Sequence, residues 1–174
     1  NAGSGSTTLR RDATPPATPT LRIANGAATT KTTSVLLSLS ATDGTNGSGL
    51  TTVRLRNDAS TWSAPYAYAT SASWTLDAVD GTRTVTVEYS DLAGNLSTAA
   101  AQILLDTAAP IGTLAIDGGA DFTTKTAASL SLSVTDGAVG SGISQMRVAN
   151  DLATLRSEEH TSELQSRLHL VCRL

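Results

Sequence analysis

The sequence predicts an all-β protein built from antiparallel β-sandwiches in series, and two observations support this fold class. Apolar residues alternate with Thr, Ser or Arg in short runs, which turn residues separate at roughly ten-residue spacing. In addition, Ser-Leu-Ser-Ala-Thr-Asp-Gly at residues 38–44 returns as Ser-Leu-Ser-Val-Thr-Asp-Gly at residues 131–137, an offset of 93 residues. The same offset relates residues 48–50 to residues 141–143. A constant offset indicates a duplicated domain, and its length suits a sandwich of about 100 residues.

Four strands are expected in the first half of the complete copy. Residues 21–24 form a short apolar run after a Pro-rich junction, and residues 35–41 carry Val, Leu or Ala at every second position. Residues 53–56 alternate Val and Leu with two Arg, which places the Arg side chains on the solvent face. Residues 62–68 hold three aromatic residues around a proline, so this segment is expected at a sheet edge or as an irregular crossing.

Three further strands complete this copy. Residues 74–76 alternate Trp and Leu with Thr, and residues 85–89 alternate Val, Val and Tyr with Thr and Glu. Residues 103–105 form the last apolar run. Gly, Asp and Asn dominate the segments between strands, because Asp and Asn bond to nearby backbone and Gly adopts positive φ. These turns are expected at residues 43–49, 57–60, 77–81 and 91–95.

The repeat divides the chain into four segments. Residues 20–107 form the complete copy, and residues 108–155 match only its first half. Since the counterparts of residues 74–95 are missing, residues 108–155 should have an unfilled core and open strand edges. We therefore predict that residues 111–155 are unstable as an isolated piece. Residues 1–19 are expected to be the end of a preceding repeat with a Pro-rich linker.

The composition changes abruptly after Leu155. The segment Arg-Ser-Glu-Glu-His-Thr-Ser-Glu-Leu-Gln-Ser at residues 156–166 resembles, codon for codon, the translation of a common sequencing adapter. We interpret residues 156–174 as a read-through artefact and exclude them from the fold argument. Leu164, Leu168 and Val171 have helical spacing, so a spurious C-terminal helix is expected there.

Composition excludes several classes of function. The chain of 174 residues has 16% charged residues and a net charge of −3, which argues against nucleic acid or an anionic membrane surface as a partner. No apolar run approaches the roughly 20 residues that a membrane-spanning helix needs. Both histidines and the one cysteine lie in residues 156–174. The rest of the chain therefore lacks the usual base for a nucleophilic serine, and we expect no enzyme.

Three motifs carry a resemblance to a known family. They are Tyr-Ser-Asp-Leu-Ala-Gly-Asn-Leu-Ser at residues 89–97, the Gly-rich loop at residues 43–49, and Asp-Thr-Ala-Ala-Pro at residues 106–110. Together they resemble bacterial immunoglobulin-like, fibronectin-III-like surface repeats. The resemblance implies tandem immunoglobulin-like sandwiches without a disulfide, located outside the cell or on the bacterial cell surface. It also implies neighbouring repeats of the same chain, and cell-surface or glycan ligands, as partners.

Two candidate binding sites follow, each with a plainer alternative. Asp43, Asp91 and Asn95 should meet at one end of the sandwich, where Asp12 approaches, and oxygen ligands of this kind suit Ca²⁺. Alternatively, these side chains only stabilise turns. Trp62 and Tyr66 are candidates for stacking on a glycan. Alternatively, they cover the core or a sheet edge.

The function that we expect is a non-catalytic extracellular structural or adhesive module, such as a stalk or spacer. Each sandwich would act as a rigid bead, and Pro-containing junctions would limit bending between beads. The alternative is a glycan- or calcium-binding accessory module of a secreted enzyme. Burial of both tryptophans would favour the spacer, and an exposed Trp62 would favour the accessory module.

Overall fold

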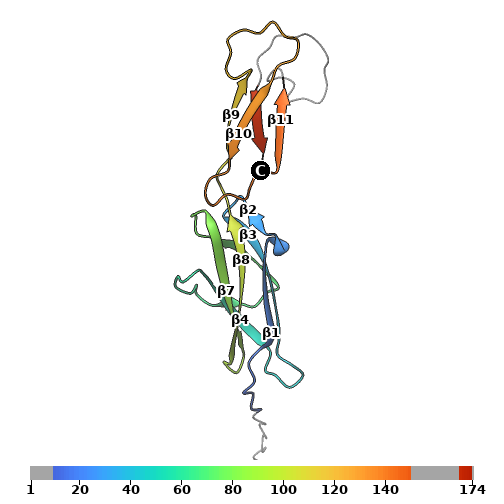
Figure 1. The fold of residues 1–174 in the computed structure, drawn as a ribbon. Coiled ribbons are helices and arrows are strands. Elements are labelled where there is room, and N and C mark those ends of the chain that lie inside the picture. The colour runs from blue at the N-terminus through green and yellow to red at the C-terminus, as the bar shows by residue number, and fades with distance from the viewer. Residues whose placement is uncertain (1–9, 150–168, 174) are drawn as a thin grey trace, which may run out of the picture. The chain divides into compact units, whose positions relative to one another are not determined.

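The computed structural model describes residues 10–149 and 169–173, which form two compact units (Figure 1). Unit 1 spans Asn1–Leu105 and unit 2 spans Asp106–Leu174. Apart from one 3-10 turn at Ala24–Gly26, all regular structure in the described residues is β-strand, which confirms the predicted all-β class. Among these residues no helix has the length and hydrophobicity needed to cross a membrane.

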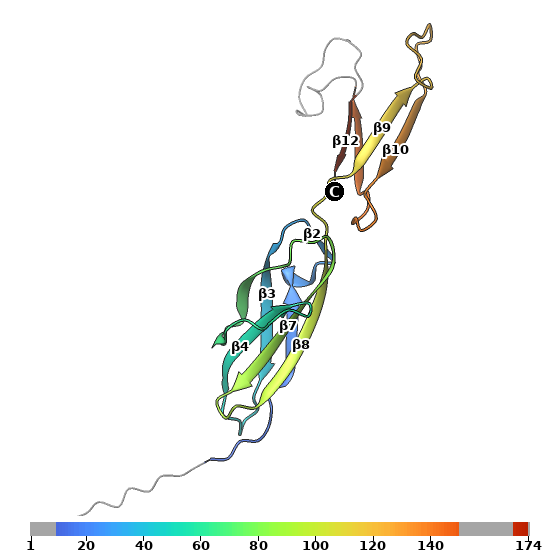
Figure 2. The ribbon, with the colours of Figure 1, turned by 90° about the vertical axis from the view of Figure 1, so that its left-hand side faces the viewer.

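Unit 1 consists of two sheets that face each other (Figure 2). The first sheet has the order β1-β3-β6, with β1 at Ala17–Ile23, β3 at Ser34–Thr42 and β6 at Ser71–Thr75. The second has the order β2-β8-β7-β4-β5. Its strands are β2 at Thr29–Thr30, β4 at Leu50–Asn57, β5 at Tyr66–Ala67, β7 at Gly81–Asp91 and β8 at Leu96–Leu105. All pairings within these two sheets are antiparallel except that of β2 with β8, which is parallel.

The core of unit 1 lies between these two sheets. Every second residue of β3, β4 and β7 points inward, so alternation in the sequence becomes a continuous apolar layer. Burying each large apolar side chain contributes about 1.5–3 kcal/mol. The side chains of this layer without solvent exposure include Leu37, Leu55, Val85, Val87 and Tyr89.

Tyr89 also joins the two sheets through its hydroxyl group. The hydroxyl donates a hydrogen bond to the carbonyl oxygen of Thr20 at 2.6 Å and accepts one from the N–H of Ser40 at 3.0 Å. Thr20 and Ser40 are paired neighbours on β1 and β3, so one side chain from the second sheet satisfies two backbone groups of the first. Burial raises the pKa of Tyr89 to about 12.

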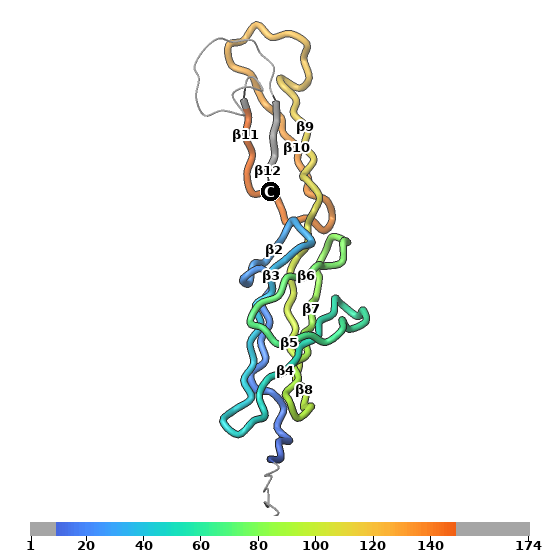
Figure 3. Tube along the Cα trace, turned by 180° about the vertical axis from the view of Figure 1, so that it is seen from behind, coloured from blue at the N-terminus to red at the C-terminus, as the bar shows by residue number. Residues whose placement is uncertain are grey.

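The strands agree with the sequence prediction in most places and differ in a few. Strand β5 lies at the sheet edge beside β4, as expected for residues 62–68 (Figure 3). Strand β8 is longer than the predicted residues 103–105, because the Ser, Thr and Ala residues at 97–101 pair with residues 85–89 of β7. Strand β2 and the 3-10 turn were not predicted, since neither segment has an apolar repeat.

Unit 2 contains four described strands (Figure 1). They are β9 at Ile111–Ile116, β10 at Leu130–Thr135, β11 at Gln145–Ala149 and β12 at His169–Arg173. The pair β9–β10 has the register of β1–β3 after a shift of 93 residues, because Thr113 stands opposite Ser133 as Thr20 stands opposite Ser40. This match is independent of side-chain identity and shows that both units start with the same strand arrangement.

The C-terminal segment differs from the expected helix where it is described. Residues 169–173 form strand β12, which pairs with β11 in an antiparallel ladder. A free strand edge offers backbone donors and acceptors, which favours an added strand over an isolated short helix. The remaining residues of the expected helical segment, and residues 1–9 of the expected preceding repeat, lie outside the described residues.

The apolar residues of unit 2 are not enclosed as those of unit 1 are. Among its described side chains, Leu130, Leu132, Met146 and Val148 are all exposed large apolar residues. These positions correspond by the offset of 93 to buried residues of β3 and β4. Among the described residues, the positions that are buried in unit 1 are therefore exposed in unit 2, and residues 150–155 of the segment expected to have an unfilled core lie outside the described residues.

Candidate functional site

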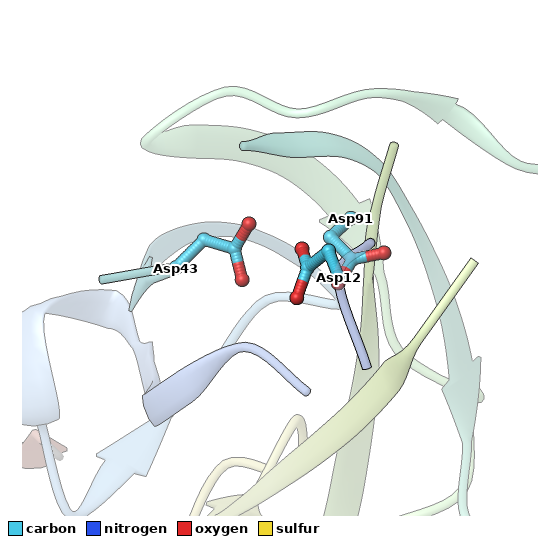
Figure 4. A group of neighbouring side chains, drawn as sticks. All are labelled: Asp12, Asp43 and Asp91. Carbon is cyan, nitrogen blue, oxygen red and sulfur yellow. The ribbon is translucent and has the colours of Figure 1, made fainter. Parts of the chain in front are cut away.

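The candidate metal site lies at one end of unit 1, where three segments of the chain meet. Asp12 comes from the segment before β1, Asp43 from the loop after β3, and Asp91 from the end of β7. One carboxylate oxygen from each residue lies within 4.8 Å of the other two. In Figure 4 the carboxylate of Asp43 is directed toward that of Asp12, and Asp91 lies beside Asp12. We call these three residues the acidic pole.

Asp12 fixes the segment before β1 to the loop between β3 and β4. Its Oδ2 accepts a hydrogen bond from the N–H of Ser48 at 2.6 Å, and its Oδ1 accepts one from the N–H of Thr14 at 3.0 Å. These hydrogen bonds favour the charged carboxylate, so they hold the pKa of Asp12 below its ordinary value. Asp12 is therefore an anion at neutral pH.

Asp43 is held by the glycines of its own loop. Its Oδ2 accepts a hydrogen bond from the N–H of Gly49 at 2.5 Å. The chain folds back closely here, and a Cβ atom on Gly47 would overlap with the carbonyl oxygen of Asp43. The other oxygen, Oδ1, is buried and has no hydrogen-bond partner. A buried oxygen without a donor carries an unmet desolvation cost, which a bound cation would offset.

Asp91 is the most enclosed member of the acidic pole, with 1% of its surface exposed. Its Oδ1 accepts a hydrogen bond from the N–H of Asn95 and its Oδ2 accepts one from Nδ2 of Asn95, both at 2.8 Å. Asn95 is thus beside the pole, as expected, but it presents an amide nitrogen to Asp91. This hydrogen bond orients the carboxylate of Asp91, and the amide oxygen of Asn95 is the atom that could act as a cation ligand.

The arrangement is compatible with both interpretations of the acidic residues. The bonds from Gly49 to Asp43 and from Asn95 to Asp91 are the local contacts that stabilise turns. The same geometry also brings three carboxylates together, and Ca²⁺ prefers six to eight oxygen ligands of this type. Three side chains supply at least three ligands, and backbone carbonyls or water would supply the others.

The aromatic candidates lie on opposite faces of the second sheet. Trp62 packs against the guanidinium groups of Arg54 and Arg56, which lie 4.9 Å and 4.6 Å from its ring centre. Both Arg residues alternate with buried residues of β4, so Trp62 lies on the outer face. Tyr66 stands opposite the buried Val53 and packs against the core, and this burial raises its pKa. The two rings therefore do not form one surface for stacking.

The outer face of β4 carries an ion pair that the sequence did not reveal. Arg54 donates from Nε to Oε1 of Glu88 at 2.7 Å and from Nη2 to Oε2 at 3.1 Å. The residues are directly opposite in the β4–β7 register. The alternation of apolar and polar residues in β4 predicted that Arg54 faces solvent. Its partner is identified only by the register of β4 and β7, which are far apart in the sequence.

Unit 2 repeats two of the contacts that build the acidic pole. The N–H of Ser141 donates to Oδ2 of Asp106 and the N–H of Gly142 donates to Oδ2 of Asp136, both at 2.6 Å. Asp136 again has a buried Oδ1 without a hydrogen-bond partner. The bond from Ser141 lowers the pKa of Asp106, as Ser48 helps to lower that of Asp12. The third carboxylate of unit 1 belongs to β7, and no described residue of unit 2 takes its place.

Comparison with known proteins adds no relative. No protein-family model matches the chain, and no curated protein or solved structure matches it. The function must therefore be inferred from the fold, the repeat and the chemistry of the acidic pole.

Proposed function

We propose that this chain is a non-catalytic structural or adhesive module, a stalk or spacer of a bacterial surface or secreted protein. The observation that carries the proposal is the recurrence of one strand arrangement at an offset of 93 residues, with the same register in β1–β3 and β9–β10. Units linked in series extend a chain without any need for a catalytic site. The absence of His and Cys from residues 1–155 fits this role.

The path of the chain through unit 1 supports a spacer role. The segment before β1 enters at one end of the sandwich, and β8 leaves at the opposite end (Figures 1 and 2). Tension applied to the two ends therefore runs along the strands. Unfolding of unit 1 under this tension requires the hydrogen bonds of the long β7–β8 ladder and the contacts between the sheets to break together, instead of one hydrogen bond at a time.

Force spectroscopy on the full chain, held at both ends, tests this proposal. We expect one abrupt extension of about 300 Å for unit 1, because about 90 folded residues can extend at about 3.3–3.6 Å each. The matched variant Tyr89→Phe should unfold at lower force, since it removes the two hydrogen bonds that join the sheets. Gradual extension of unit 1 without an abrupt step would count against a spacer that resists tension.

A second candidate function is calcium binding, in the manner of an accessory module of a secreted enzyme. The specific observation in its favour is the acidic pole, with three carboxylate oxygens within 4.8 Å and a buried oxygen of Asp43 that lacks a donor. Calcium in a 100-fold excess over its dissociation constant would stabilise unit 1 by about 2.7 kcal/mol.

Calorimetry and thermal melting with calcium or with chelator test this candidate. We expect Asp43→Asn and Asp91→Asn to abolish the response to calcium. The variant Asp121→Asn, at an exposed position outside the acidic pole, should retain that response. Absence of binding heat, with the same melting temperature in calcium and in chelator, would leave turn stabilisation as the role of these residues.

A further inference from the structure

The outer face of the second sheet of unit 1 carries an excess of positive charge around Trp62. The guanidinium groups of Arg54 and Arg56 both lie within 4.9 Å of the centre of its ring. Glu88 binds Arg54 through two hydrogen bonds and neutralises the charge of that residue. We call Arg54, Arg56 and Trp62 the arginine–tryptophan cluster. Its two arginines are balanced by a single glutamate, so one positive charge remains.

Arg56 supplies the charge that is not neutralised. It stands opposite Thr86 on β7, and Thr86 stands opposite Ala100 on β8, so neither neighbour across the ladder is acidic. The next carboxylate along the chain, that of Asp58, pairs with Arg83. Among the described residues Arg56 has no ion-pair partner, and its Nε is buried without a hydrogen-bond partner. An anionic group bound at this guanidinium would compensate the charge.

A hollow of about 260 Å³ lies beside the cluster on the same sheet. Thr52 and Ser90 stand opposite each other across β4 and β7 at this place, and Leu96 is 49% exposed. The hollow is lined by charged, hydroxyl-bearing and apolar residues, which include Arg54, Glu88, Thr52, Ser90, Pro65 and Leu96. This mixture suits a ligand that itself combines an anionic group, hydroxyl groups and apolar faces.

An acidic sugar has this combination of groups. Its carboxylate matches the planar guanidinium of an arginine, and its hydroxyl groups can donate to and accept from Thr52 and Ser90. Its C–H groups form apolar faces that pack on an aromatic ring or on Leu96. An acidic peptide would offer carboxylates to Arg56 but few hydroxyl groups to the hollow. The lining therefore favours the sugar over the peptide.

We propose that this face of unit 1 binds an acidic glycan, a chain of sugars that carry carboxylate groups. Arg56 binds one carboxylate, and the partly exposed ring of Trp62 contacts the sugar that bears it. The hollow beside Arg54 holds a neighbouring sugar. This activity goes beyond the spacer role, and it requires neither the acidic pole nor unit 2.

Calorimetric titration of the full chain with oligomers of galacturonate tests the proposal. A chelator is present throughout, because carboxylates also bind Ca²⁺ and the acidic pole must not contribute. We expect saturable binding, and binding at least about tenfold weaker for Arg56→Gln, which loses a charged donor. The matched control is Arg22→Gln, since Arg22 is exposed on β1 of the first sheet, and its affinity should equal that of the wild type. Neutral galactose oligomers of the same length should also bind at least about tenfold more weakly.

NMR spectra of the wild-type chain separate a specific site from a general attraction between charges. With galacturonate oligomers we expect the resonances of the Trp62 indole N–H and of the Thr52 and Ser90 amides to shift, while those of unit 2 stay in place. This measurement needs no variant, so it decides the matter even where Arg56→Gln does not fold. Oligoglutamate that binds as tightly as the sugar would identify an acidic peptide as the ligand and overturn the proposal. The absence of saturable binding, full affinity in Arg56→Gln, or shifts confined to other residues would overturn it as well.

Discussion

The two units carry equivalent apolar residues at equivalent positions, yet among the described residues only those of unit 1 form a buried core. Leu37 is fully buried and Leu55 likewise, whereas their counterparts Leu130 and Val148 are 39% and 40% exposed. The strands that bear these residues have the same pairing register in β1–β3 and β9–β10. The comparison teaches that the alternation of apolar and polar residues determines which face of a strand each side chain occupies. The opposite sheet determines whether the apolar side chains become buried from solvent. Local pattern and burial are thus separate contributions to stability.

The largest expected contrast comes from truncating one leucine in each unit. Leu37→Ala should destabilise unit 1 by about 2–5 kcal/mol, because it leaves a cavity between two sheets. Leu130→Ala should cost less than about 1 kcal/mol, since its side chain is already partly in water. Urea unfolding followed by tryptophan fluorescence measures unit 1, where both tryptophans lie, and amide exchange in β10 measures unit 2. Similar costs in the two units would contradict the comparison.

The next contrast concerns the tyrosine that only unit 1 has. Tyr89→Phe should cost about 1–3 kcal/mol, because it leaves the N–H of Ser40 and the carbonyl of Thr20 without their buried partner. The pKa of Tyr89 is raised from 10.0 to about 12 by burial, so its contribution is complete below pH 10 and is lost between pH 10 and about 12.

Alkaline unfolding curves check this contribution. Wild-type unit 1 should lose stability across that pH window, and Tyr89→Phe should show a weaker dependence. The matched variant is Tyr66→Phe, because burial also raises the pKa of Tyr66. Comparing the alkaline unfolding curves of the two variants separates the contribution of Tyr89 from that of Tyr66. An unchanged alkaline dependence in Tyr89→Phe would show that this hydroxyl does not titrate with unfolding.

A smaller effect is expected at the turn that the two units share. Gly47→Ala and Gly140→Ala each place a Cβ atom against the carbonyl oxygen of Asp43 or of Asp136. Each substitution should shift its turn, at a cost of about 1–2 kcal/mol. Amide exchange at Ser48 and Gly49, and at Ser141 and Gly142, should accelerate in the respective variants. Faster exchange in only one unit would show that this turn depends on a complete core.

The smallest expected effect is an acid dependence that both units share. The pKa values of Asp12 and Asp106 lie below 3.8, mainly because of hydrogen bonds from neighbouring residues. A lowered pKa contributes stability that is present above the ordinary value and is lost as pH falls through the folded-state value. Asp12→Asn should therefore flatten the acid branch of unit 1 unfolding below about pH 4, and Asp106→Asn should have the same effect on amide exchange at Ser141. An acid branch as steep in Asp12→Asn as in the wild type would rule out this carboxylate as its source.

Much of unit 1 could be predicted from the sequence because its strands alternate clearly. The period of two identified the inward-facing positions in residues 35–41 and 85–89, and the apolar residues at these alternate positions are all buried, whereas Leu36, between them, is 50% exposed. The long strand β8 escaped prediction because Ser, Thr and Ala carry no apolar signal, and only pairing with β7 makes them a strand.

The candidate site was predictable in part. Turn chemistry placed Asp43 and Asp91 at one end of the sandwich, and the structure brings them together with Asp12. The role of Asn95 as a donor depends on which atom of its amide faces Asp91, which no pattern of residues contains. The separation of Trp62 from Tyr66 depends on the face that each occupies, and the proline between them breaks the alternation that would have indicated it.

The exposed apolar residues of β10 and β11 have a consequence for the behaviour of the chain in solution. Clustered apolar surface promotes self-association, whereas a closed core resists heat. Solubility should therefore be governed by unit 2, and the melting temperature by unit 1. Substitutions that improve one of these properties need not change the other.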